Sequence, residues 1–208
     1  IFVVRNNNNL SDKIECGFYN ENIKSEYLFP RSLFSNSIFY LGFSENYLSI
    51  LYKIKENCNP ISEYVDFWYG KGGLTPEVNF NKIGIKVLTG KEISRFSFNE
   101  LETQWHIETE KLNEKDIVRA KTEKVVVQDI VAHVTKPKPH IKLIASLDIS
   151  EQFCLNTVMC FADNGTGVSN KFTLALINSK FISFYFYFFI FNQAIRTMHF
   201  MPGYSDLI

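Results

Sequence analysis

Residues 124–131 read KVVVQDIV, and this stretch decides the class of fold. β-Branched residues dominate it, which makes it the strongest strand signal in the chain. Ile141–Leu147 and Phe153–Phe161 are also predicted strands, as are Glu63–Tyr69 and Ile83–Leu88 earlier in the chain. We therefore expect strands to cluster in the middle of the sequence.

Three weaker signals surround these strands. Ser94–Phe98 alternates between polar and apolar residues and is expected to pair with Ile83–Leu88. The acidic segment 99–116 is expected to be surface, partly helical at best. Asp163–Gly167 (DNGTG) is expected to be a hairpin turn.

Helices are predicted on both sides of the strands. Ser44–Asn57 (SENYLSILYKIKEN) is a clear helix, because its apolar residues share one face and Ser44 is a suitable N-cap. A helical pattern returns at Ser169, and a second helix is expected to run from Asn178 or Ser179 to about residue 192. The fold class is therefore α+β, with a twisted mixed or antiparallel β-sheet flanked by helices and a C-terminal aromatic helix.

The aromatic stretch Phe181–Phe191 (FISFYFYFFIF) is too short to cross a membrane. It has eleven residues, whereas a membrane-spanning helix needs about twenty. We expect it to be a helix buried in the domain and expect no membrane partner.

The charge pattern is ambiguous. The net charge is zero, which counts against a nucleic-acid-binding protein. However, seven acids accompany three bases from Glu92 to Asp116, and six bases accompany two acids from Arg119 to Ala145. Both runs are also compatible with ordinary solvated surface.

The four cysteines, Cys16, Cys58, Cys154 and Cys160, contain no CxxC pair, so they do not form a zinc pattern. We expect reduced thiols that act as small buried hydrophobic side chains in a cytoplasmic protein.

Four segments occur in a particular order along the chain. They are ISEYVDFWYGKGGLT at Ile61–Thr75, KVLTGKEISRF at Lys86–Phe96, KVVVQDI at Lys124–Ile130 and LALINSKFISFYFY at Leu174–Tyr187. Their order and spacing resemble the TaqI-type C-terminal specificity domain, over about residues 45–208. The second segment is similar to the box K-x-L-x-G-x-D-I-x-R-[YF] of that family, with Glu92 in place of the usual Asp.

The resemblance implies a domain that recognises duplex DNA. Such domains occur in adenine-specific DNA methyltransferases and in type IIG restriction-modification enzymes, and type I specificity subunits have related domains. In that family the domain faces a catalytic domain across a cleft that holds the DNA, while the catalytic domain flips out the target adenine. We therefore expect 44–208 to be a DNA target recognition domain and 1–43 to be the tail of a preceding catalytic domain.

The chemistry of methyl transfer is expected to lie elsewhere. The only Asn-Pro pair, Asn59-Pro60, lacks the second proline and the aromatic residue of the methyltransferase loop that holds adenine. No Gly-rich loop suits S-adenosylmethionine, so we expect no cofactor on this fragment and a separate catalytic domain, in the same or another chain, that binds it. We expect no enzyme activity here and a DNA adenine methyltransferase as the parent protein, with or without a fused endonuclease.

A nuclease is the weaker catalytic alternative. Glu108-x-Glu110-Lys111 is similar to the end of a metal-dependent carboxylate motif, with Asp66 as its upstream partner. An acidic solvated face explains the same residues more simply. The four histidines lie far apart in sequence and include no i, i+4 pair for zinc.

DNA recognition needs cations or backbone N–H groups for phosphates, and paired donors and acceptors for base edges. The residues that we expect to contact DNA are Lys71, Gly72, Gly73, Thr75, Lys91, Arg95, Gln128, Lys136, Lys138, His140, Ser179, Lys180, Arg196 and His199.

Each group among them has a structural alternative. The Lys71–Gly73 loop is also compatible with a plain turn, and Arg95 with an ion pair to Glu92. Gln128 suits adenine but also suits contact with a neighbouring strand. The loop 136–140 (KPKPH) is expected to project because its two prolines exclude regular pairing, but it can equally be a solvated tip.

The segment Asn178-Ser179-Lys180 opens a helix, which is a ready phosphate site, although Asn and Ser are also ordinary caps. The alternative to DNA recognition as a whole is a protein–protein docking domain of a restriction-modification specificity subunit. That alternative predicts weak, salt-insensitive DNA binding.

Overall fold

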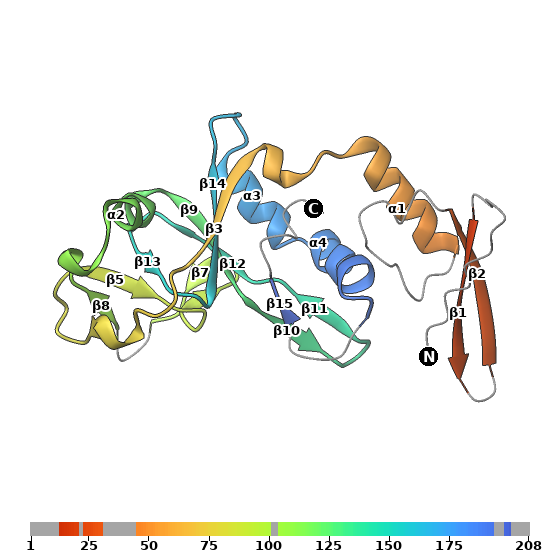
Figure 1. Cartoon of the computed structure of the whole chain (residues 1–208), viewed down its shortest axis with the longest axis horizontal. Coiled ribbons are helices and arrows are strands. Elements are labelled where there is room, and N and C mark those ends of the chain that lie inside the picture. Colours follow the sequence, from red (N-terminus) through yellow and green to blue (C-terminus); the bar gives the residue numbers. More distant parts are fainter. Residues whose placement is uncertain (1–12, 21–22, 31–44, 101–103, 194–197, 201–208) are drawn as a thin grey trace. The chain divides into compact units, whose positions relative to one another are not determined.

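The structure is a computed structural model of the whole chain, and it describes residues 13–20, 23–30, 45–100, 104–193 and 198–200 (Figure 1). The chain divides into two compact units, residues 1–58 and residues 59–208. The predicted strands and helices described above lie in the second unit, apart from the first helix.

The first unit contains a hairpin and a helix. Strand β1 (Lys13–Asn20) pairs antiparallel with β2 (Ile23–Pro30) over their whole lengths. Helix α1 (Glu45–Asn57) confirms the helix predicted at this position.

The central sheet of the second unit has the order β12-β9-β14-β3 and is antiparallel throughout. Its strands are β3 (Val65–Tyr69), β9 (Lys124–Gln128), β12 (Ala145–Asp148) and β14 (Val158–Asp163). Val125, Val126 and Val127 are fully buried, since β9 lies inside the sheet. The KVVVQ stretch is therefore the core strand that its composition predicts.

A second sheet has the order β13-β5-β8-β4. Its strands are β4 (Val78–Asn79), β5 (Ile85–Leu88), β8 (His106–Ile107) and β13 (Phe153–Cys154), with β13 parallel to β5 and the other pairs antiparallel. Helix α2 (Glu114–Lys121) lies against β13 (Figure 1). The prediction that segment 99–116 is surface is wrong in part, because Ile107 is fully buried in the core of this sheet.

A third sheet has β10 (Ile130–Val134) between β11 (His140–Lys142) and β15 (Met198–His199). Separately, β6 (Ile93–Ser94) and β7 (Ser97–Phe98) form a hairpin of their own. The predicted pairing of Ser94–Phe98 with the strand at Ile83–Leu88 is therefore wrong. The two residues between β6 and β7 reverse the chain before it reaches that strand.

Three predicted continuous strands are broken in two, and the breaks are neighbours in space. One separates β9 from β10 at Asp129, one separates β11 from β12 at Leu143–Ile144, and one separates β13 from β14 at Leu155–Thr157. The backbone N–H of Gln128 donates to the Ile144 carbonyl (3.0 Å), and that of Asp129 donates to the Thr157 carbonyl (3.0 Å). We call this line of breaks the crease.

Two helices follow the central sheet. Helix α3 (Asn170–Ile177) contacts β12 and β9, and α4 (Lys180–Tyr185) continues into a π-helical turn, η5 (Phe186–Ile190). The turn at 163–167 leads into α3, so its prediction as a hairpin turn is wrong. Short 3-10 turns occupy η2 (Ile61–Glu63), η3 (Thr75–Glu77) and η4 (Thr109–Lys111).

The aromatic stretch is a buried helix, as predicted, with one exposed face. Phe186 and Phe189 are fully buried, and Phe186 stacks on Phe200 with ring centroids 4.9 Å apart. Phe181 is 47% exposed. Among the described helices, none alone is long and apolar enough to span a membrane, and only the bent pair Asn170–Ile177 and Lys180–Ile190 passes that test jointly.

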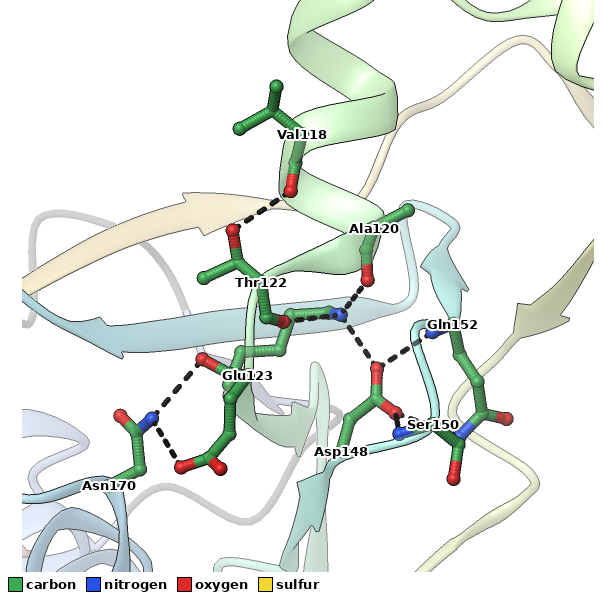
Figure 2. A network of polar contacts seen from close by, with 9 residues as sticks. Val118, Ala120, Thr122, Glu123, Asp148, Ser150, Gln152 and Asn170 are labelled. Carbon is green, nitrogen blue, oxygen red and sulfur yellow. Dashed lines mark hydrogen bonds and ion pairs between the residues drawn. The ribbon is translucent and has the colours of Figure 1, made fainter.

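A buried ion pair joins two strands of the central sheet, and its lysine also holds the end of α2. The Lys124 ammonium lies 2.6 Å from Asp148 Oδ2, and their side chains are 1% and 0% exposed. Lys124 also donates to the carbonyls of Ala120 (2.8 Å) and Thr122 (3.1 Å), at the end of α2. Figure 2 shows Asp148 accepting further bonds from the segment that follows it: its carboxylate binds the backbone N–H of Ser150 and both the backbone and the side-chain amide of Gln152.

The cysteines differ in exposure. Cys154 and Cys160 are buried free thiols, as predicted, whereas Cys58 is exposed. Burial raises the pKa of the Cys160 thiol well above its ordinary value, and its hydrogen bond with Cys154 raises that pKa further.

Candidate nucleic-acid interface

The turn at Leu155–Thr157, on the crease, supports the Gly-rich loop. Lys71 forms a parallel bridge with Leu155, and its backbone N–H donates to the Cys154 carbonyl (2.9 Å). A Cβ at Gly70 would lie 1.9 Å from the Leu155 carbonyl oxygen, so only glycine permits this close approach. Gly73 has a φ of +78°, a conformation that favours glycine in the same way.

The Lys71 side chain points toward α2 and is only partly available to a ligand. Its ammonium forms an ion pair with Asp116 on α2, at a depression of about 250 Å³. Gly72, Gly73 and Thr75 are exposed, and Thr75 opens η3. The loop therefore offers its backbone more readily than its lysine.

The second predicted segment is a turn held by a buried carboxylate. Glu92 is 5% exposed and accepts hydrogen bonds from the backbone N–H (2.8 Å) and the hydroxyl (2.6 Å) of Thr89. The backbone N–H of Gly90 donates to the Thr157 hydroxyl (3.1 Å), which ties this turn to the crease. Lys91 is exposed at the centre of the turn.

Gln128 braces the same turn. Its side-chain Nε2 donates to the carbonyls of Gly90 and Ile93, each at 2.8 Å. Both amide hydrogens are thus used within the protein. The alternative, contact with a neighbouring strand, is therefore confirmed, because Ile93 belongs to β6.

His199, on β15, is held by the carboxylate of Asp129, the residue at the break between β9 and β10. Its Nδ1 lies 2.6 Å from Asp129 Oδ2, and its side chain is 53% exposed. Asp129 is 6% exposed and also accepts from the Tyr69 hydroxyl (2.9 Å). The backbone N–H of Phe200 donates to the Asp129 carbonyl (2.7 Å), so backbone and side chain both fix the histidine.

The segment Asn178-Ser179-Lys180 is joined to β12. The Asn178 side chain accepts from the backbone N–H of Ala145 (3.1 Å) and donates to the carbonyl of the same residue (2.9 Å). Asn178 is 4% exposed, so it is structural. The Ser179 hydroxyl accepts from the Ile182 N–H (3.0 Å) and caps α4, whereas Lys180 is exposed.

Arg95 approaches the same junction from the β6–β7 hairpin. Its guanidinium donates to the Asn178 carbonyl (3.0 Å) and lies over the Phe96 ring, 5.0 Å from its centroid. The alternative ion pair between Arg95 and Glu92 is therefore wrong, because Glu92 is used by Thr89. The backbone N–H of Phe96 donates to the Ala145 carbonyl (2.9 Å), so the hairpin tip and the start of α4 meet at one residue.

The remaining predicted residues lie apart from these groups. Lys136 and Lys138 are exposed between β10 and β11, which confirms the predicted exposed loop. His140 opens β11, and its Nδ1 lies 2.8 Å from the Lys138 carbonyl. Arg196 lies outside the described residues.

Sequence reasoning missed three features of this region. Phe96 is 53% exposed and has a φ of +64°. Asp129 and Tyr69 position His199, and no spacing signal connects residues that lie this far apart. The Arg119 guanidinium lies over the Trp68 ring at 5.2 Å, beside the Lys71–Asp116 pair.

The nuclease alternative finds no structural counterpart in the part of the chain that the structure describes. No three His, Cys, Asp or Glu side chains there lie close enough to hold a metal ion. Glu108 and Glu110 are exposed beside η4.

Comparison with known proteins agrees with three of the four segments, those at Lys86–Phe96, Lys124–Ile130 and Leu174–Tyr187. A family model described as the TaqI-like C-terminal specificity domain matches residues 85–203. The match includes the Thr89–Glu92 turn, the crease, the Asn178 junction and His199, and it begins after the Lys71–Gly73 loop. A search of curated proteins found no significant match.

Proposed function

Because this chain belongs to the TaqI-like C-terminal specificity domain family, we propose that it reads the sequence of duplex DNA for an adenine-specific DNA methyltransferase. The methyltransferase domain, with its S-adenosylmethionine site, is a separate domain of the same or another chain. The parent is a modification enzyme or a type IIG enzyme that also carries a nuclease.

One observation carries this proposal. Lys91 is exposed on the Thr89–Glu92 turn and His199 is exposed on β15, both beside the crease, and polar side chains that are buried or half-buried fix both segments. Glu92 and Gln128 hold the turn, and Asp129 holds His199 on the strand. A site whose exposed groups are fixed in advance loses little conformational entropy when it binds.

The exposed groups divide into two chemical roles. Lys91, Lys136, Lys138 and Lys180 carry compact positive charges that suit phosphate oxygens. Arg95 and His199 present planar nitrogen groups that suit base edges. The Gly72–Gly73 backbone suits close approach to the sugar-phosphate chain.

Binding of the chain to a pool of random-sequence duplexes, over a salt series, tests this proposal. We expect an enriched motif of a few base pairs and an affinity that falls steeply with salt. Lys91→Ala and Lys180→Ala should each reduce the slope of log affinity against log salt by about 0.9, the value for one phosphate contact. Lys171→Ala is the matched control, since Lys171 is also an exposed lysine but lies on α3.

The docking alternative predicts a different result. No enriched motif and no salt dependence, with a folded chain, would exclude DNA reading by this domain. The exposed apolar side chains of α3 and α4, such as Phe172 and Phe181, would then be tested as a surface for the catalytic domain.

A further inference from the structure

The tip of the β6–β7 hairpin holds an aromatic residue in an unfavourable backbone conformation. Ser94 pairs with Ser97, so Arg95 and Phe96 are the two turn residues. Phe96 has a φ of +64°, in the left-handed region that glycine and asparagine adopt readily and a bulky residue does not. The turn therefore contains a side chain that lowers the stability of the fold.

Burial of the Phe96 ring does not offset this loss of stability. The Phe96 side chain is 53% exposed, although its backbone N–H is anchored to the fully buried Ala145 at 2.9 Å. The ring is covered on one side by the Arg95 guanidinium, which is itself fixed by the Asn178 carbonyl. A strained, exposed and rigidly mounted ring is expected where the ring contacts a ligand.

The charges around the tip favour a nucleic acid as that ligand. Lys91 is exposed at the base of the same hairpin, and Lys180 is exposed two residues after the carbonyl that Arg95 contacts. The acid between Lys91 and the tip, Glu92, is buried and bonded to Thr89. An aromatic ring flanked by exposed cations suits a base stack that lies between two phosphate chains.

We propose that Phe96 is a wedge that inserts between two adjacent base pairs of the bound duplex and partly unstacks them. Arg95 acts as the positioning residue, because it stacks on the ring and fixes it against α3 and α4. Opening a base step lowers the cost of extruding a neighbouring base, so the wedge would assist the catalytic domain. This inference rests on the proposed function and adds DNA distortion to sequence reading.

Chemical probing of the enriched duplex tests the wedge. Permanganate attacks unstacked pyrimidines and diethyl pyrocarbonate attacks unstacked purines. With the wild-type chain bound, we expect enhanced reactivity at one base step. Phe96→Asn should abolish the enhancement and weaken binding roughly tenfold, the order of one aromatic–base stack.

Two controls separate the wedge from a structural role. Phe96→Asn should unfold at the same temperature or higher, because asparagine tolerates the left-handed conformation. Phe96→Tyr should keep the enhanced reactivity, since it keeps the ring. Phe172→Asn, at a side chain that is 58% exposed on α3, should leave both reactivity and affinity unchanged.

The possible failures are distinguishable. Tight, sequence-specific binding without enhanced reactivity at any step would overturn the wedge and leave the proposed function intact, as would enhancement that persists in Phe96→Asn. A lower unfolding temperature for Phe96→Asn would show that the ring stabilises the fold, and would overturn its role as a wedge. A wild-type chain that binds no DNA would overturn the proposed function and the wedge together.

Discussion

Asp129 and His199 are 70 residues apart in sequence, yet Asp129 Oδ2 lies 2.6 Å from His199 Nδ1. Because the carboxylate binds Nδ1, the other ring nitrogen, Nε2, points away from the carboxylate. The buried Asp129 therefore sets the direction of a half-exposed imidazole on the crease.

The first prediction concerns this pair. Asp129→Ala should lower the free energy of unfolding by about 1–3 kcal/mol, because His199 loses its acceptor, whereas the Tyr69 hydroxyl keeps the Phe200 carbonyl (2.6 Å). In a His199→Ala background the same change should cost less. Urea denaturation of the two single variants and the double variant measures this coupling, and strictly additive losses would contradict it.

The second prediction concerns the buried pair Lys124–Asp148. Lys124→Met should destabilise the fold by about 3–5 kcal/mol, because it leaves a buried carboxylate without its cation. Adding Asp148→Asn should recover part of the loss, since an amide oxygen at the position of Oδ1 still accepts from the Ser150 backbone N–H and the Gln152 side chain. Lys121→Met, at an exposed position on α2, is the control and should change stability by less than about 0.5 kcal/mol.

The third prediction separates the two residues that open α4. Ser179→Ala removes only the cap and should cost about 1 kcal/mol. Asn178→Ala removes both bonds to Ala145 and should cost more, while also loosening the carbonyl that Arg95 contacts. We expect Asn178→Ala to weaken DNA binding and Ser179→Ala to leave it nearly unchanged; thermal unfolding and a binding titration measure the two effects.

The fourth prediction concerns Gln128. Because both of its amide hydrogens bind carbonyls of the Thr89–Ile93 turn, Gln128→Leu should lower stability by about 1–3 kcal/mol. Its effect on DNA should be a general loss of affinity. The motif that Gln128→Leu selects is then compared with the motif of the wild-type chain. A change at one base position, without a loss of stability, would instead show that Gln128 reads a base.

The fifth prediction is a dependence of stability on pH. Burial raises the pKa of the Cys160 thiol well above the value of about 8.5 that the unfolded chain has. As pH rises past about 8.5, the unfolded chain loses this proton while the folded chain keeps it, so stability is full below that pH and falls above it. Cys160→Val should reduce the slope of unfolding free energy between about pH 8.5 and 10, and an unchanged slope would assign it to other groups.

For α1 and for the main strands and helices of the second unit, the sequence was sufficient for the type of element but not for its ends. The β-branched run at 124–128 forms a core strand, because a continuous run of apolar side chains is stable only where both faces of the strand are buried. The break at Asp129 was not predictable. It depends on a hydrogen bond to Thr157, which is distant in sequence.

The candidate site shows the same division. Exposure of Lys91, Lys136 and Lys180 follows from residue type alone. The supporting contacts of Glu92, Gln128 and Asn178 do not, because a polar side chain near a turn is equally suited to a ligand and to a neighbouring backbone. The left-handed conformation of Phe96 runs against its residue type, so no local pattern predicts it.

The crease also separates the β10–β11 hairpin from the central sheet. Strands β10 and β11 leave the central sheet at this line and pair with each other, so the register of the central strands does not depend on the length of the tip at residues 135–139. Doubling the length of such a loop costs only about 0.6 kcal/mol in closure entropy. The tip of this hairpin can thus change in length or sequence while the valine-rich strand β9 and the Lys124–Asp148 pair keep the central sheet unchanged.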